Sequence, residues 1–357
     1  MKHIQKIVIT LALLGLFATP ATANKSGWQP TDLNKKQRAL FYGSKEDVLT
    51  KKVCVGRKTV SIECRDRLHY VHSNELHHYV WYKYTKNLGG GYVGVGSDQN
   101  FTFIAWARSR FVWLMDYDPV VVWINHIHKA LVLHSATSKD YLALWETKNF
   151  KKARKIIQSA YKNHPKVSWM LKTHRKYARM LQKHFLRKIV KYRKKKWIPV
   201  DFSWVHREKD YQYIRTLFQK GRIRIMKGDL TKSLTLTGIG KASHALGVPV
   251  RIVYTSNAEQ FWAYPAQFQK NMIGLNMDQK SIVLRTIFSK SYGSTLDRSW
   301  VYFIHEGKHF QKYLKKGYKN VRNFIRSRKF VSPGLFTIGK VPKHLPAYMY
   351  KKIKKKK

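Results

Sequence analysis

The clearest pattern of apolar and polar positions lies between residues 89 and 118. The glycine-punctuated run GGGYVGVGSDQN comes first, the apolar segment FTFIAWARS follows, and the run FVWLMDYD ends in acids. Short apolar runs bounded by glycines or acids are typical of strands that are buried on both faces of a parallel sheet. The pattern therefore predicts a strand, a short helix and a second strand.

The same alternation resumes after Gly221. Strands are predicted over 222–226, 250–254, 281–286 and 300–304, and a helix over 234–246 ends at Gly247. Strands that alternate with helices form a largely parallel sheet covered on both faces. The predicted fold class is α/β, a Rossmann-like largely parallel sheet with helices on both faces.

Helical patterns fill the rest of the chain. Helices are predicted over 35–42, from an N-cap at Ser73 through Lys86, over 119–134 with Pro119 in the first turn, and over 167–190. In the last of these, apolar residues recur at steps of three and four, and basic residues fill the other face. We expect a basic helical insertion over about residues 139–212 of an α/β domain that spans 73–338.

The N-terminus has the pattern of a secretion signal over residues 1–23. Two lysines precede an apolar core over 7–18, and Ala-Thr-Ala at 21–23 fits a cleavage site. The core is shorter than the roughly 20 residues that span a bilayer. We expect an exported protein, periplasmic or secreted, with no transmembrane segment in its mature part.

An N-terminal extension over 24–72 contains the two cysteines of the chain. Cys54 and Cys64 bracket a predicted hairpin, and in an oxidising compartment a disulfide between them is expected. It would hold the short hairpin together, because a redox pair needs closer spacing and a metal site would need more ligands nearby.

The charge is extreme, with 70 Lys and Arg against 19 Asp and Glu. Residues 148–197 carry 19 basic residues and no acid, and the tail over 339–357 is again rich in lysine and free of acids. Such blocks attract polyanions such as lipopolysaccharide, anionic lipid or nucleic acid. A generally cationic exported protein with solvated basic faces remains the alternative.

Strand ends predict where a small molecule would bind. In open α/β sheets ligands bind outside the carboxyl ends of the strands, and a spacing of 20 residues from Gly96 to Asp116 suits an acid that accepts from ribose hydroxyls. The alternative is structural, with glycines in a tight turn and Asp116, Asp118 or Ser256 capping helices. The residues gathered at this edge are Gly94, Gly96, Asp98, Asp116, Asp229, Ser256, Asn257 and Glu259.

Several motifs in order resemble a family of uncharacterised bacterial proteins, with leptospiral members, that has a class I S-adenosylmethionine methyltransferase-like domain. The motifs are SNE at 73–75, GGYVGVGSDQN at 90–100, the strand ending at Asp116, KGDL at 227–230, YTSNAEQFW at 254–262 and SIVLRT at 281–286. The resemblance implies S-adenosylmethionine as cofactor. Gly94, Gly96, Asp98, Asp116, Asp229 and Ser256 would then bind it, and Asn257 and Glu259 would face the transferring group, with Glu259 as a base.

His305 and His309 formally complete the H-E-x-x-H pattern of zinc hydrolases. A helix-weakening glycine follows the glutamate, and no third ligand stands at a defined spacing, so no metal site is predicted. The leading hypothesis is an exported protein with a nucleotide- or S-adenosylmethionine-type ligand cleft and a methyltransferase-like fold. A non-catalytic envelope protein that binds polyanions is the alternative.

Overall fold

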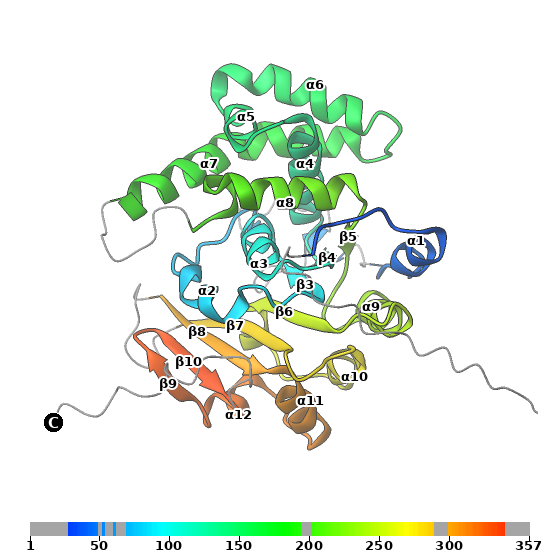
Figure 1. Cartoon of the computed structure of the whole chain (residues 1–357), viewed down its shortest axis with the longest axis vertical. Coiled ribbons are helices and arrows are strands. Elements are labelled where there is room, and N and C mark those ends of the chain that lie inside the picture. Colours follow the sequence, from blue (N-terminus) through cyan, green and yellow to red (C-terminus); the bar gives the residue numbers. More distant parts are fainter. Residues whose placement is uncertain are drawn as a thin grey trace, which may run out of the picture.

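An eight-stranded sheet forms the centre of the molecule (Figure 1). The computed structural model describes residues 28–48, 52–53, 60–61, 69–193, 202–288 and 299–339. The strand order is β5-β4-β3-β6-β7-β8-β10-β9, and the first five strands are parallel. β8 runs antiparallel to β7 and parallel to β10, and β9 is an antiparallel edge strand. The strands are β3 (Gly91–Val95), β4 (Phe111–Asp116), β5 (Ile223–Lys227), β6 (Val250–Ser256), β7 (Ile282–Phe288), β8 (Trp300–Glu306), β9 (Lys329–Ser332) and β10 (Leu335–Ile338).

The predicted fold class is confirmed. All six strands expected from the apolar runs form, and each pairs in the central sheet. The order of the five parallel strands is that of a Rossmann sheet, which starts in the middle, proceeds to one edge and then returns to the other side. β9 and β10 were not predicted, because these four-residue strands have little apolar alternation of their own.

Helices cover both faces of the sheet. They are α1 (Lys35–Tyr42), α2 (Tyr82–Thr85), α3 (Gln99–Ala107), α4 (Pro119–His134), α5 (Ser138–Ala143), α6 (Phe150–Ala160), α7 (Val167–Arg193), α8 (Glu208–Gln219), α9 (Thr235–Ala245), α10 (Ala266–Gly274), α11 (Gly307–Lys315) and α12 (Val321–Ile325). Figure 1 shows α5, α6 and α7 grouped beyond α4 and α8 at one end of the molecule, with α10, α11 and α12 towards the other end. The predicted helices over 35–42 and 119–134 have the expected bounds.

Alternate residues of each strand feed two separate cores. In β4, Val112 and Leu114 pack with α3, α4 and α8, whereas Phe111, Trp113 and Met115 pack with α1, α9 and α10 on the opposite face. Side chains alternate across a strand, so a strand that is apolar throughout must be covered on both faces. This explains why the β4 run contains no polar residue before Asp116.

One predicted helix is wrong in its first half. Residues 73–77 are not helical, and a 3-10 turn, η1 (His78–Trp81), leads into the single turn of α2. The Ser73 hydroxyl accepts from the Glu75 amide at 3.1 Å, which closes a local turn and does not cap a helix. This segment stays extended because long-range contacts, described below, hold it.

Several expectations concern residues outside the described ranges. These are the signal over 1–23, the Cys54–Cys64 pair and the tail beyond 339. Two short strands, β1 (Lys52–Val53) and β2 (Val60–Ser61), do pair antiparallel where a hairpin was expected. Among the described residues, no helix has the length and apolar character needed to cross a membrane.

We predict that Gly94→Ala lowers the free energy of unfolding by about 1–3 kcal/mol. A Cβ at Gly94 would lie 2.2 Å from Asn100 Oδ1 and 2.6 Å from a ring carbon of Tyr92, both buried. Gly274→Ala in α10 is the matched control, because a Cβ there meets no atom within 4 Å. Denaturant unfolding should show the loss for Gly94→Ala alone, and equal stability of the two variants would contradict the packing argument.

Candidate functional site

The order of the sheet reverses between β3 and β6, and this switch point defines the candidate site. In open α/β sheets the crevice for a ligand lies outside the carboxyl ends of the strands at such a point. The β3 strand leads there into Gly96, whose φ of 91° lies in the region that favours glycine. The Asn125 side chain from α4 holds the Gly96 carbonyl at 2.9 Å.

Asp116 lies beside this turn, at the carboxyl end of β4. Its Oδ2 accepts from the Gly96 amide and its Oδ1 from the Asp118 amide, both at 2.9 Å. Asp118 itself caps α4 by accepting from the Val120 amide at 2.8 Å. The structural alternative therefore holds for Asp118 but not for Asp116, whose carboxylate spans two strand ends.

The environment of Asp116 favours its neutral form. Burial raises the pKa of this carboxyl, repulsion by Asp118 raises it further, and backbone amides offset only part of the effect, so the pKa is about 7. Hydroxyl groups of a ligand that donated to Asp116 would stabilise the ionised form. Further hydrogen bonds to this carboxylate would therefore be favourable.

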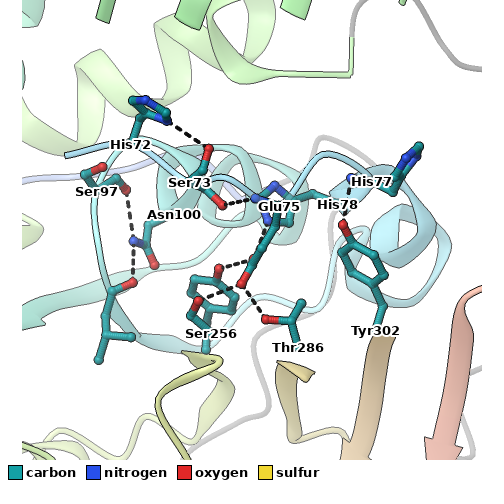
Figure 2. Close-up of polar contacts among 12 residues, drawn as sticks. His72, Ser73, Glu75, His77, His78, Ser97, Asn100, Ser256, Thr286 and Tyr302 are labelled. Atoms are coloured by element: carbon teal, nitrogen blue, oxygen red, sulfur yellow. Dashed lines mark hydrogen bonds and ion pairs between the residues drawn. The ribbon is translucent and has the colours of Figure 1, made fainter. Parts of the chain in front are cut away.

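Residues 69–78 cross the carboxyl edge of the sheet from β4 to β8. The His69 ring lies 2.6 Å from the Asp118 carboxylate, and the Ser97 hydroxyl donates to the Val71 carbonyl at 2.7 Å. At the far end, the His77 amide donates to the Tyr302 hydroxyl at 2.9 Å (Figure 2). The segment therefore covers the ends of β3 and of β6 to β8. The ends of β4 and β5 lie next to the segment and are not covered by its central part.

The carboxylate of Glu75 is the centre of this crossing (Figure 2). Tyr254 OH donates to its Oε2 at 2.6 Å, and the His78 Nε2 lies 2.7 Å from the same oxygen. Ser256 donates to Oε1 at 2.6 Å, and Thr286 donates to the same oxygen. Each oxygen has two side-chain partners, so this buried charge is fully hydrogen-bonded.

Burial alone would raise the pKa of Glu75, but its partners outweigh burial. The hydrogen bond and charge of His78, together with the hydroxyls of Ser256 and Thr286, hold the pKa of Glu75 below its ordinary value. The ionised carboxylate of Glu75 therefore connects residues 69–78 to the sheet. We call this set of contacts the Glu75 tie. Sequence reasoning had found Glu75 only as part of the SNE motif, without a role.

Two residues expected in the cleft face elsewhere. Asp98 is fully buried, and its Oδ2 lies 3.2 Å from His184 Nε2 of α7, so its side chain contacts the helical insertion. Gly94 is surrounded by Asn100 and Tyr92 side chains, so its lack of a Cβ serves helix–strand packing. Neither the Asp98 side chain nor the Cα of Gly94 is placed to contact a ligand at Asp116.

The loop after β6 also differs from the expected arrangement. Ser256, with a φ of 51°, turns its hydroxyl to Glu75. The buried Glu259 carboxylate accepts from Thr255 at 2.6 Å, from Tyr264, and pairs with the buried Arg285 at 3.3 Å. These partners give Glu259 a structural role, and Asn257 is half-buried at the start of a 3-10 turn.

Asp229 binds its own loop. Its Oδ1 accepts from the Thr231 amide and hydroxyl at 2.8 and 2.7 Å, and its amide donates to Asp47 of the N-terminal extension at 3.1 Å. The side chain and the amide of Asp229, which was expected to bind the cofactor, are thus both engaged within the protein. Tyr117 follows Asp116, is 38% exposed, and lies close enough to Asp229 and to the exposed Tyr70 for their charges to affect it.

Acids gather at this edge although the chain is strongly basic. Those at or beside the carboxyl ends of the parallel strands are Glu46, Asp47, Glu75, Asp98, Asp116, Asp118, Asp229 and Glu259. They leave little place for a phosphate there. The edge suits hydroxyl donors and cationic groups.

The H-E-x-x-H pattern does not form a zinc helix. His305 lies in β8, which ends at Glu306, while His309 lies in α11, and their rings contact each other at 2.8 Å between Nε2 and Nδ1. Within the described ranges, no group of three or more His, Cys, Asp or Glu side chains is arranged to hold a metal ion.

We predict that Glu75→Gln costs about 3 kcal/mol of stability at pH 7, because it removes a buried charge and leaves donors without an acceptor. The folded-state pKa of Glu75 is lowered, so its stabilisation is complete above the unfolded-state pKa of about 4.3 and is lost as the pH falls through the lower folded value. The difference in the free energy of unfolding between wild type and variant, measured by denaturant unfolding, should therefore become smaller below about pH 4.

The matched control for this change is Glu46→Gln. Glu46 is half-buried and accepts from the Lys227 amide at 3.0 Å, a bond that a glutamine oxygen can keep. We expect a loss below about 0.5 kcal/mol for it. An equally small loss for Glu75→Gln would rule out the tie.

Comparison with known proteins adds a family and a weak structural likeness. A search of curated proteins finds no match. Two solved structures of the rRNA methyltransferase aviRa from Streptomyces viridochromogenes, at 2.4 Å and 1.5 Å, are 12% and 13% identical to this chain in sequence. The matches cover 57% and 56% of this chain and 67% of each aviRa chain, with a TM-score of 0.23. That score carries no argument about function. The model of a family described as "Domain of unknown function (DUF7790)" matches residues 70–337, and the chain therefore belongs to the DUF7790 family.

Proposed function

We propose that this protein binds a nucleoside-type ligand of the S-adenosylmethionine class at the carboxyl ends of β4 and β5. The observation that carries the proposal is Asp116, which joins the Gly96 turn to the end of β4 and has a pKa of about 7. The two hydroxyls of a ribose would donate to its carboxylate. The half-exposed ring of Tyr117 would contact the base.

The charge of the edge supports this ligand class over a phosphorylated nucleotide. Asp116, Asp118 and Asp229 all lie close enough to Tyr117 to raise its pKa, after burial has done so first. A phosphate would be repelled by the carboxylates of Asp118 and Asp229 and by ionised Asp116, whereas a sulfonium or ammonium group would be attracted by them and would favour the ionised form of Asp116. S-adenosylmethionine carries both of these cationic groups.

Methyl transfer would need a bound methyl acceptor, and sometimes a base. Glu259 is engaged by Arg285 and Tyr264, so we do not carry it forward as the base. The function that we propose is therefore ligand binding on a Rossmann sheet. Methyl transfer is the reaction that a ligand of this class could undergo if a methyl acceptor were bound beside it.

Adenosine is the probe for the pH dependence, because its own groups do not titrate between pH 6 and 8. Hydroxyl donors favour ionised Asp116, so affinity should rise as the pH rises through the pKa of about 7. Isothermal titration calorimetry should show about tenfold tighter binding at pH 8 than at pH 6, since the ionised fraction changes by that factor.

Asp116→Asn should weaken adenosine and S-adenosylhomocysteine at pH 8 by at least about tenfold, because charged acceptors make the stronger hydrogen bonds. It should also abolish the pH dependence. Asp32→Asn is the control, since Asp32 is exposed and pairs with Lys220 at 2.7 Å. Absence of binding in the folded wild type, or an unchanged affinity in Asp116→Asn, would refute the proposal.

Polyanion binding is the second candidate, and the surface of α6 and α7 favours it. All Lys and Arg side chains described on these helices are exposed, and the sequence from 148 to 197 contains no acid. They are Lys151, Lys152, Arg154 and Lys155 of α6 and Lys172, Arg175, Lys176, Arg179 and Lys183 of α7. The α7 residues recur at helical spacing and form one cationic stripe.

Replacing Lys172, Arg175, Lys176 and Arg179 together by glutamine should weaken binding of single-stranded DNA and of anionic vesicles. The slope of log affinity against log salt for DNA should fall by about 0.7 for each phosphate that the variant no longer neutralises. A control replaces four exposed lysines elsewhere, namely Lys35, Lys36, Lys280 and Lys315. Equal effects of the two sets would show that net charge, and not this stripe, drives binding.

A further inference from the structure

A pocket of about 350 Å³ lies on the amino side of β3 and β4, where α2 and α3 end and α8 begins. Its wall includes Lys86 from the turn after α2, Trp106 and Arg108 from the end of α3, and Lys209 from the first turn of α8. The pocket is distinct from the candidate site, because Asp116 is at the opposite, carboxyl end of β4. Its volume is within the range of small-molecule sites.

The wall of this pocket carries an excess of positive charge. Asp210 is the one acid that lines it, and it is shared by two guanidinium groups, Arg108 Nη2 at 3.0 Å and Arg207 Nη1 at 3.3 Å. Lys86 and Lys209 add two exposed ammonium groups. The single carboxylate fixes the two arginines in place without neutralising the four cations.

Two aromatic residues make this wall more than a charged surface. The Tyr82 ring has Lys86 Nζ at 5.8 Å and the Arg207 guanidinium at 5.7 Å from its centroid, which holds these cations at the pocket. Trp106 is 3% exposed, and its indole N–H has no hydrogen-bond partner among the described residues. Buried donors are normally satisfied, so an acceptor that reached this N–H from the pocket would supply the missing hydrogen bond.

We propose that this pocket binds a small phosphate-bearing molecule. Arginine forks and lysines are the side chains that recognise phosphate oxygens, and the indole N–H of Trp106 is a further donor at the same wall. The phosphate could be free or part of a nucleotide.

Calorimetry on the whole chain at about 150 mM salt distinguishes these sources, since exposed charges are then screened beyond about 8 Å. Pyrophosphate and adenosine 5′-monophosphate are titrated separately into the Asp116→Asn protein, in which the proposed nucleoside site is weakened, with adenosine as the phosphate-free control. Saturable one-site binding of pyrophosphate alone indicates a free phosphate ligand, and tighter binding of the monophosphate indicates a nucleotide. If neither pyrophosphate nor the monophosphate shows one-site binding, the proposal is overturned.

Arg207→Gln with Lys209→Gln should weaken the binding at least tenfold. Lys172→Gln with Arg175→Gln removes the same charge from the exposed face of α7 and should change it less than twofold. Trp106→Phe removes the N–H without changing any charge and should weaken binding several-fold. Equal losses in the two charge variants, or no effect of Trp106→Phe in a protein with an unchanged melting temperature, would overturn the proposal.

The test is independent of the nucleoside site. Asp116→Asn should leave phosphate binding unchanged, because Asp116 lies at the other end of β4 from Arg108. Failure of one proposal therefore leaves the other standing.

Discussion

Glu75 places a buried negative charge between the ends of β6 and β7, and four side chains meet it there. A charge in such a place is tolerated only when its partners replace the water that it loses. The contacts of Glu75 join the N-terminal segment to β6 and β7, beside the switch point of the sheet. They fix the centre of the extended segment 69–78 and the hydroxyl of Ser256, while His69, Val71 and His77 hold the rest of the segment.

This constraint decides which part of the carboxyl edge is available to a ligand. The segment occupies the ends of β6 and β7, while Asp116 and Tyr117 lie at the ends of β4 and β5. Several acids lie at or beside this edge, whereas exposed cations line α6, α7 and the pocket beside Trp106. The two proposed sites therefore differ in local charge, and one suits hydroxyl or cationic groups while the other suits phosphate.

Much of the fold followed from the sequence, because buried parallel strands are apolar throughout and glycines and acids mark their ends. The Gly96–Asp116 contact was also within reach, since a βαβ unit fixes the spacing between its two strand ends. The Glu75 tie was not, because its partners in the sheet stand 179 to 211 residues away. Glu259 was assigned to the cleft because its pairing with Arg285, on the next strand, leaves no local signal.

The most direct test of the account is a crystal structure of the chain with S-adenosylhomocysteine. We expect ribose hydroxyls within hydrogen-bond distance of the Asp116 carboxylate, the base beside Tyr117, and the Glu75 contacts intact. A ligand bound at another place, or one that displaced residues 69–78 and broke the contacts of Glu75, would contradict it.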